Sequence, residues 1–227
     1  MDSLKSPMAG TWRGMPTNIN GKVILFLIMA LMFVSVIIFD EIPLVMNKGG
    51  RHEHLASIRW ILLPHGILGF IGLVLGPLQF SSRIREHNYA RHRMLGKIYV
   101  TAILTTSLLS IIIATVYPMP GGTPRFIFEN CVQGSVWFLT TLMAFILARN
   151  RQIGLHKIWM ARSYGVTFVF VMARVLDPTT FMQKMGIEAF TDFLYFTIII
   201  GLVVPDILLN WKAIFIRKKG TEYELPA

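Results

Sequence analysis

Residues 83–99 read RIREHNYARHRMLGKIY and separate two long apolar runs of the chain. This stretch holds five of the 22 Lys and Arg residues and two of the six His residues, but only one acidic residue, Glu86. A second basic stretch, LARNRQIGLHKIWMARSY at residues 147–164, echoes its order of His, cation, bulky apolar residue, cation and Tyr. Basic stretches between apolar segments mark the cytoplasmic ends of membrane helices. The two stretches therefore predict a helical membrane bundle with one basic face.

The composition of the 227-residue chain is also typical of a membrane protein. Hydrophobic residues make up 54% of the chain and charged residues only 15%, whereas soluble domains carry about 25% charged residues. The net charge of +10 is concentrated in short loops, where it favours contact with anionic lipid over binding to nucleic acid. The single cysteine, Cys131, excludes both an intrachain disulfide and a cysteine-based metal cluster.

Six apolar segments are long enough for membrane spans, since a helix needs roughly 20 apolar residues to cross a bilayer core of about 30 Å. Lys and Arg residues number 16 in the two tails and the two basic stretches, against six on the opposite side. The side rich in Lys and Arg is normally cytoplasmic. We therefore expect an all-α bundle of six transmembrane helices at residues 22–216, with a disordered cytoplasmic tail at residues 1–21 and a basic cytoplasmic tail at residues 217–227. The expected spans cover about residues 22–39, 59–80, 94–116, 126–148, 158–176 and 191–209.

Two polar residues, His65 and Arg174, are expected in the membrane near its outer side. His65 follows Arg59 by six residues in the second expected span, which corresponds to a depth of roughly 9 Å at 1.5 Å per residue. Arg174 is near the same end of the fifth expected span. Because polar groups at membrane depth are costly and are commonly functional, His65 and Arg174 are candidate catalytic residues. The alternative for His65 is a neutral side chain that bonds to a neighbouring helix.

Glycines recur after His65 on one face of the second expected span, at positions Gly66, Gly69, Gly72 and Gly76. Such a face permits close approach of another helix, or leaves room for a flat cofactor. Asp206 is the one carboxylate that we expect deep in a span. The segment RHEH at residues 51–54 offers three potential metal ligands, but no fourth ligand is evident, so no metal site is predicted.

Two further histidines, His92 and His156, open the third and fifth expected spans at the same depth. A pair of this kind can supply both axial ligands of a b-type haem, so His92 and His156 are candidate cofactor ligands. The alternative is an interfacial position among cations. Other polar residues toward the basic face are candidates for binding a substrate or a lipid: Gln79, Arg93, Lys97, Tyr99, Arg162 and Tyr164.

Several of these residues form a pattern that resembles a family of integral membrane proteins of unknown function found in bacteria and fungi. The pattern combines His65 with G-P-L-Q-F at residues 76–80 and H-R-x-L-G-x-x-Y at residues 92–99. The later H-x-x-W-M-x-R-S-Y at residues 156–164 and Arg174 also resemble family positions. The resemblance covers about residues 55–174 and implies no established activity. A weaker likeness is to transmembrane b-type cytochromes, although the fourth expected span lacks the His that the usual two-haem arrangement requires.

Three classes of function remain open on these features. A membrane oxidoreductase or redox partner would act on a lipophilic substrate, with haem b as its candidate cofactor. A non-enzymatic binder or transporter would line a cavity between helices with the same polar groups. A membrane-bound cyclase or isomerase would need an acidic residue as general acid. All three classes place the protein in a lipid bilayer as an integral, multi-pass protein with a lipophilic small molecule as partner.

Overall fold

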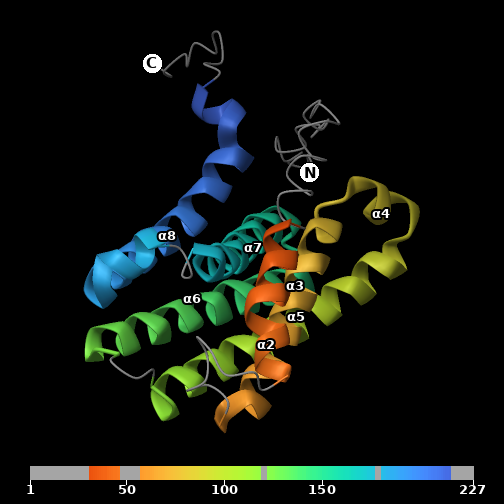
Figure 1. Ribbon diagram of the computed structural model, residues 1–227. Helices are drawn as coiled ribbons and strands as arrows, with labels where there is room; N and C mark the ends of the chain where they lie inside the picture. The colour runs from red at the N-terminus through yellow and green to blue at the C-terminus, as the bar shows by residue number, and fades with distance from the viewer. Residues whose placement is uncertain (1–30, 47–56, 119–121, 177–179, 216–227) are drawn as a thin grey trace, which may run out of the picture.

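The computed structural model describes residues 31–46, 57–118, 122–176 and 180–215 (Figure 1). Within these ranges the chain is all-α and has no strand, which confirms the expected fold class. Residues 31–36 are helical and continue through the π-helical turn η1 (Ile37–Glu41) into α2 (Ile42–Val45). The other helices are α3 (Arg59–Gln79), α4 (Ser82–His87), α5 (Tyr89–Val116), α6 (Pro124–Arg149), α7 (Ile153–Leu176) and α8 (Thr180–Phe215).

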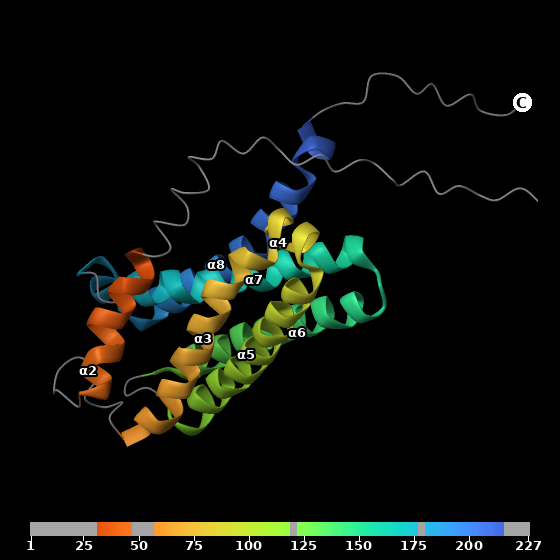
Figure 2. The same cartoon turned by 90° about the vertical axis from the view of Figure 1, so that its right-hand side faces the viewer.

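The five long helices pack in the order of the chain. Helix α3 packs on α5, α5 on α6, α6 on α7 and α7 on α8, and the short α4 lies at the end of the bundle between α3 and α5 (Figure 2). Helix α7 also contacts α3, and α6 also contacts α8, so α6 and α7 each touch three of the other long helices and have central positions. The carboxyl-terminal part of α8 extends away from the bundle in both views (Figures 1 and 2).

Among the described residues, four helical segments are long and apolar enough to cross a membrane: α3, α5, α6 and Lys184–Asn210 of α8. The expected span at residues 158–176 forms helix α7, but it is not among these four. Its buried face carries the hydroxyl residues Ser163 and Thr167, which other helices surround. A helix that is enclosed by protein need not be apolar enough for contact with lipid. The protein is an integral, multi-pass membrane protein, and half of the first expected span, residues 22–30, lies outside the described residues.

Side-chain caps organise the basic stretch at residues 83–99. The Ser81 hydroxyl accepts a hydrogen bond from the Ile84 amide at 3.4 Å, and the Asn88 side chain accepts one from the Arg91 amide at 2.9 Å. Such caps satisfy amide groups that the first turn of a helix leaves without partners. Helix α5 therefore begins at Tyr89, five residues before the expected start of the span, and includes His92 in its first turns.

Two of the four glycines on α3 serve close packing between helices. A Cβ atom at Gly72 would clash with the Ile103 side chain of α5, and one at Gly76 would clash with the Tyr164 ring of α7. The other two, Gly66 and Gly69, face an open space instead. Close packing of helices therefore explains Gly72 and Gly76, whereas Gly66 and Gly69 leave room for a ligand.

Candidate functional site

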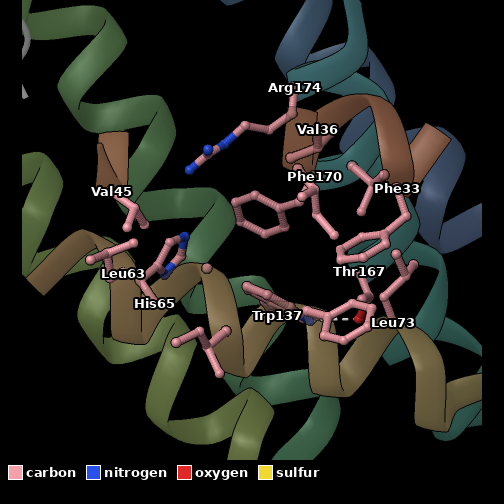
Figure 3. A pocket seen from close by; sticks show the side chains of 16 residues that line it. Phe33, Val36, Val45, Leu63, His65, Leu73, Trp137, Thr167, Phe170 and Arg174 are labelled. Atoms are coloured by element: carbon pink, nitrogen blue, oxygen red, sulfur yellow. Dashed lines mark hydrogen bonds between the residues drawn. The ribbon is translucent and has the colours of Figure 1, made fainter. Parts of the chain in front are cut away.

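A cavity of about 290 Å³ lies between α3, α6, α7 and the helical segment at residues 31–45 (Figure 3). Its lining is mostly apolar and includes four aromatic side chains, with His65 and Arg174 as its charged or titratable groups. The residues that line it are Phe33, Val36, Ile37, Val45, Leu63, His65, Gly66, Ile67, Gly69, Phe70, Leu73, Trp137, Thr167, Phe170, Val171 and Arg174.

Aromatic pairs form two walls of the cavity. Phe33 stacks on Phe70 of α3, with ring centroids 3.9 Å apart and an interplanar angle of 16°. Trp137 of α6 packs against Phe170 of α7 at a centroid distance of 4.4 Å. The first pair attaches the segment at residues 31–45 to α3, so this segment covers the cavity. Ile67 also lines the cavity while 58% of its surface is exposed, which places one edge of the cavity at the outside of the bundle.

His65 is held in one orientation by Thr106 of α5. The Thr106 hydroxyl donates to the His65 carbonyl oxygen at 2.8 Å, so its proton is not directed at the imidazole. The Nδ1 atom of His65 lies 3.0 Å from the Thr106 carbonyl oxygen and 2.9 Å from the Thr106 hydroxyl oxygen. A carbonyl oxygen only accepts, so Nδ1 carries the proton and donates. In this tautomer Nε2 has a lone pair, and no described residue donates a hydrogen bond to it.

Replacement of the Thr106 hydroxyl should loosen this arrangement. We expect Thr106→Val to lower the free energy of unfolding in lipid by about 1 kcal/mol, the usual value of one net hydrogen bond. Thr105→Val is the matched control, because Thr105 is exposed on the same helix and should change stability by less than about 0.5 kcal/mol. Thermal unfolding of both variants in nanodiscs measures the difference. Equal stability of the two variants would show that the Thr106 hydroxyl does not anchor His65.

A directed chain of buried hydrogen bonds lies beneath the cavity. Trp137 Nε1 donates to the Thr167 hydroxyl at 2.8 Å, and that hydroxyl donates to the Ser163 carbonyl at 2.9 Å (Figure 3). The Thr141 hydroxyl donates to the Trp137 carbonyl at 2.8 Å, so it accepts from the Ser163 hydroxyl at 2.6 Å. Ser163 in turn accepts from the Tyr99 hydroxyl at 2.9 Å. These bonds fix the register of α5, α6 and α7 around the wall of the cavity.

Arg174 lies across the cavity from His65. Its side chain extends from α7 toward the imidazole in Figure 3, and both residues line the same space. The sequence predicted this proximity, and the structure brings the two residues together. Their predicted role as catalytic residues stays a prediction.

The other predicted site residues lie elsewhere in the bundle. None of His92, His156, Gln79, Arg93, Lys97, Tyr99, Arg162 and Tyr164 lines the cavity. Tyr99 is buried in the hydrogen-bonded chain, whereas Arg93 and Lys97 are exposed on α5. Arg162 forms an ion pair with Asp206, and Tyr164 donates to the Leu73 carbonyl at 3.3 Å. The structure therefore separates the predicted residues into a cavity set and a set toward the basic end.

The two predicted haem ligands, His92 and His156, lie on α5 and α7 and make different contacts. His156 donates from Nδ1 to the Ala144 carbonyl at 2.8 Å, while the His92 ring stacks on Tyr89 in the first turns of α5. A bis-histidine haem needs a flat slot between its two ligand helices. Near this end, the Tyr164 ring fills the surface of α3 at Gly76, and Gln79 fills the surface of α5 at Gly96. Both of these contacts are made with α3, and haem ligation by His92 and His156 stays a prediction.

Acidic residues in the bundle differ from the expectation that Asp206 alone lies deep in a span. Glu129 lies five residues after the start of α6 and is fully buried. Its signal in the sequence is its position one helical turn before Gln133, within the expected span at residues 126–148. The RHEH segment at residues 51–54 lies outside the described residues, and no group of three potential metal ligands occurs among the described ones.

The fold and the cavity define an all-α integral membrane protein with an apolar, ligand-sized site inside its helical bundle. Residues 62–210 match the model of a family described as "Predicted membrane protein (DUF2306)", and the chain belongs to this family. The resemblance noted from the sequence is confirmed at this level. No curated protein and no solved structure matches the chain.

Proposed function

We propose that this protein binds a lipophilic small molecule in the cavity, with a polar head group of the ligand at His65. The observation that carries the proposal is the combination of an aromatic, apolar lining with one oriented imidazole. The volume of about 290 Å³ is near the lower end of the range of about 300–1,000 Å³ for ligand pockets. A cavity edge at the exposed Ile67 would let such a molecule enter from the bilayer.

The chemistry of the cavity limits the head group of the ligand. His65 offers an acceptor at Nε2, so the matching group on the ligand is a hydrogen-bond donor such as a hydroxyl. Arg174 adds donors on the opposite side, which suit an oxygen acceptor on the same ligand. Aromatic side chains surround the remaining space and suit an apolar body. The expected ligand is therefore a compact amphiphile that carries a hydroxyl or a protonated acid.

Of the three function classes, a non-enzymatic binder or a transporter has the best structural support. The oxidoreductase hypothesis rests on the placement of the His residues and on the family likeness, and neither His92 nor His156 lines the cavity. The cyclase or isomerase hypothesis needs an acid at the substrate, and no carboxylate is among the described side chains that line the cavity. His65 and Arg174 are accordingly proposed as ligand-binding residues.

We also propose six spans with both termini cytoplasmic, a domain at residues 22–216 and cytoplasmic tails on either side of it. The four long apolar helices support the multi-pass part of this arrangement, and the distribution of Lys and Arg supports the orientation. Reporter tags at each terminus, probed in sealed vesicles, test the orientation. A terminus that is accessible only from the non-cytoplasmic side would contradict six spans.

Photolabelling in lipid nanodiscs tests ligand binding. The probe is a long-chain alcohol with a diazirine, and a diazirine hydrocarbon of equal length without the hydroxyl is its control. We expect the alcohol to label cavity residues, and His65→Ala to reduce this labelling about tenfold, the effect of one lost hydrogen bond of about 1.4 kcal/mol. Gly69→Leu should also prevent labelling, because a Cβ atom at Gly69 meets only ordinary contacts and the longer side chain fills the cavity.

The matched control for Gly69→Leu is Val74→Leu, which adds bulk to an exposed position of the same helix outside the cavity. This variant should be labelled like the wild type. Equal labelling by the alcohol and the hydrocarbon would contradict a role for His65. Labelling that survives Gly69→Leu would contradict the cavity as the binding site.

A further inference from the structure

Glu129 is a fully buried carboxyl group in the membrane-spanning helix α6. It is 0% exposed, and neither of its oxygens has a hydrogen-bond partner among the described residues. Gln133 lies one helical turn further along α6, is 2% exposed, and has an Nε2 atom that also lacks a partner there. Residues four positions apart share one face of a helix. Two buried polar groups are therefore adjacent and unpaired in the interior of the bundle.

The helix register places Glu129 where α6, α7 and α8 converge. The hydrogen bonds from Trp137 to Thr167 and between Thr141 and Ser163 show that α6 and α7 run antiparallel in constant register. Continued by two turns, this register brings Glu129 to the level of Val175.

The contact between α7 and α8 shows which residue of α8 lies at the level of Glu129. A Cβ atom at Gly165 would clash with the backbone of Gly201, so these two residues lie at the same level. The same antiparallel register, continued for ten residues, brings Val175 to the level of Thr191. Thr191 is itself fully buried, and its hydroxyl donates to the Ile187 carbonyl at 2.7 Å. Glu129 therefore lies at the level of a second buried polar side chain, on α8.

An ion-pair cluster, here called the latch, joins α6 to α8 one turn nearer the helix ends. Arg125 precedes Glu129 by one turn and pairs with both Asp192 and Glu188, the latter at 3.3 Å. Asp192 directly follows Thr191 in the chain. Gly186, with a φ of 77°, bends α8 two residues before Glu188. The latch therefore bridges α6 and α8 one turn from Glu129 and lies next to a bend in the backbone.

The charged groups around Glu129 do not neutralise it. On its own helix, Arg125 is engaged by the two acids of α8. On α7, Arg174 has interactions of its own and gives neither Glu129 oxygen a hydrogen bond. An ionised carboxylate without a partner in an apolar interior costs many kcal/mol, whereas a protonated one gains a donor and keeps an acceptor for the Gln133 amide.

We propose that Glu129 is a proton-binding site inside the bundle, which exchanges its proton with the outer aqueous side when the latch opens. The reaction is the addition of one proton to the carboxylate and its release to water, and no other bond changes. The proposal is independent of the ligand cavity, since Glu129 is not part of its lining.

Infrared spectroscopy of the protein in nanodiscs tests the proton site. The wild type should show the carbonyl stretch of a protonated carboxyl group at neutral pH, and this band should shift slowly after transfer to D₂O. Glu129→Gln should remove the band, and Glu129→Asp should move it. Glu86→Gln, which removes an exposed acid, should leave the band unchanged. Arg125→Gln and Asp192→Asn should each accelerate the deuterium shift by up to about fivefold, since each breaks an exposed ion pair of the latch.

Each alternative outcome overturns a stated part of the proposal. Absence of the band in the wild type, or its persistence in both Glu129 variants, would exclude a proton on Glu129. A band that appears only when Na⁺ and K⁺ are removed would make Glu129 a ligand of a metal cation instead. An exchange rate that both latch variants leave unchanged would exclude that water reaches Glu129 between α6 and α8 when the latch opens.

Discussion

Gly165→Ala should destabilise the protein by about 3 kcal/mol, the upper part of the usual cost of overpacking a core. Gly165 of α7 lies against Gly201 of α8, so the two backbones are in direct contact. The added Cβ atom would clash with the carbonyl oxygen of Gly201 and would lie 2.9 Å from the Pro205 ring. A backbone group cannot rotate away as a side chain can, so α8 has to move. Unfolding in lipid or mild detergent, followed by circular dichroism, measures the loss.

Gly154→Ala provides the control on the same helix. No atom lies within 4 Å of a Cβ atom at Gly154, which is exposed. The substitution should be neutral or should stabilise the helix by up to about 1 kcal/mol, because Ala has the higher helix propensity. If Gly165→Ala were as stable as Gly154→Ala, then α7 and α8 would not be in the close contact described above.

The sequence predicted the helices better than the contacts between them. Apolar length and basic flanks predicted the positions of α3, α5 and α6 within a few residues, because these helices have lipid-facing surfaces. The same criteria predicted a span at residues 158–176, which forms most of α7, where Ser163 and Thr167 are enclosed by neighbouring helices. Apolarity reports contact with lipid, so it describes a central helix poorly. Helix α5 begins five residues before the expected span, because a capping residue, Asn88, determines where the helix starts.

For the candidate site, the position of each residue along its expected span was sufficient to predict that His65 and Arg174 lie close together. Both are polar residues at the same end of their spans. The cavity itself could not be predicted, because its aromatic walls pair Phe33 with Phe70 and Trp137 with Phe170 across different helices. The partner of His65 is a backbone carbonyl of α5, which has no signature in the sequence. Glu129 was missed because its position near a helix end resembles an ordinary terminal charge. Its burial depends on how α8 packs against α6.

The second large effect is expected from Arg162→Gln, which should lower the free energy of unfolding by about 2 kcal/mol. Arg162 of α7 binds Asp206 of α8 through two hydrogen bonds, of 3.0 Å from Nε and 2.5 Å from a terminal nitrogen. Removal of one partner of a fully buried pair costs about 3–5 kcal/mol. The side chains here are 28% and 34% exposed, so water compensates for part of the loss. Arg162 also stacks over the Trp159 ring at 4.8 Å, and this contact is lost as well.

A double-mutant cycle separates the pairing of Arg162 and Asp206 from the other contacts of each residue. Asp206→Asn alone should also destabilise, but the combined Arg162→Gln and Asp206→Asn variant should recover about 1–2 kcal/mol relative to the sum of the two single changes. Arg85→Gln breaks an exposed contact of 3.9 Å with Glu86 and should cost less than about 1 kcal/mol. Additive single effects would show that the two charges do not interact. Since Pro205 precedes Asp206 where α8 leaves the bundle, a positive coupling would identify the Arg162–Asp206 pair as the contact that holds this part of α8 against α7.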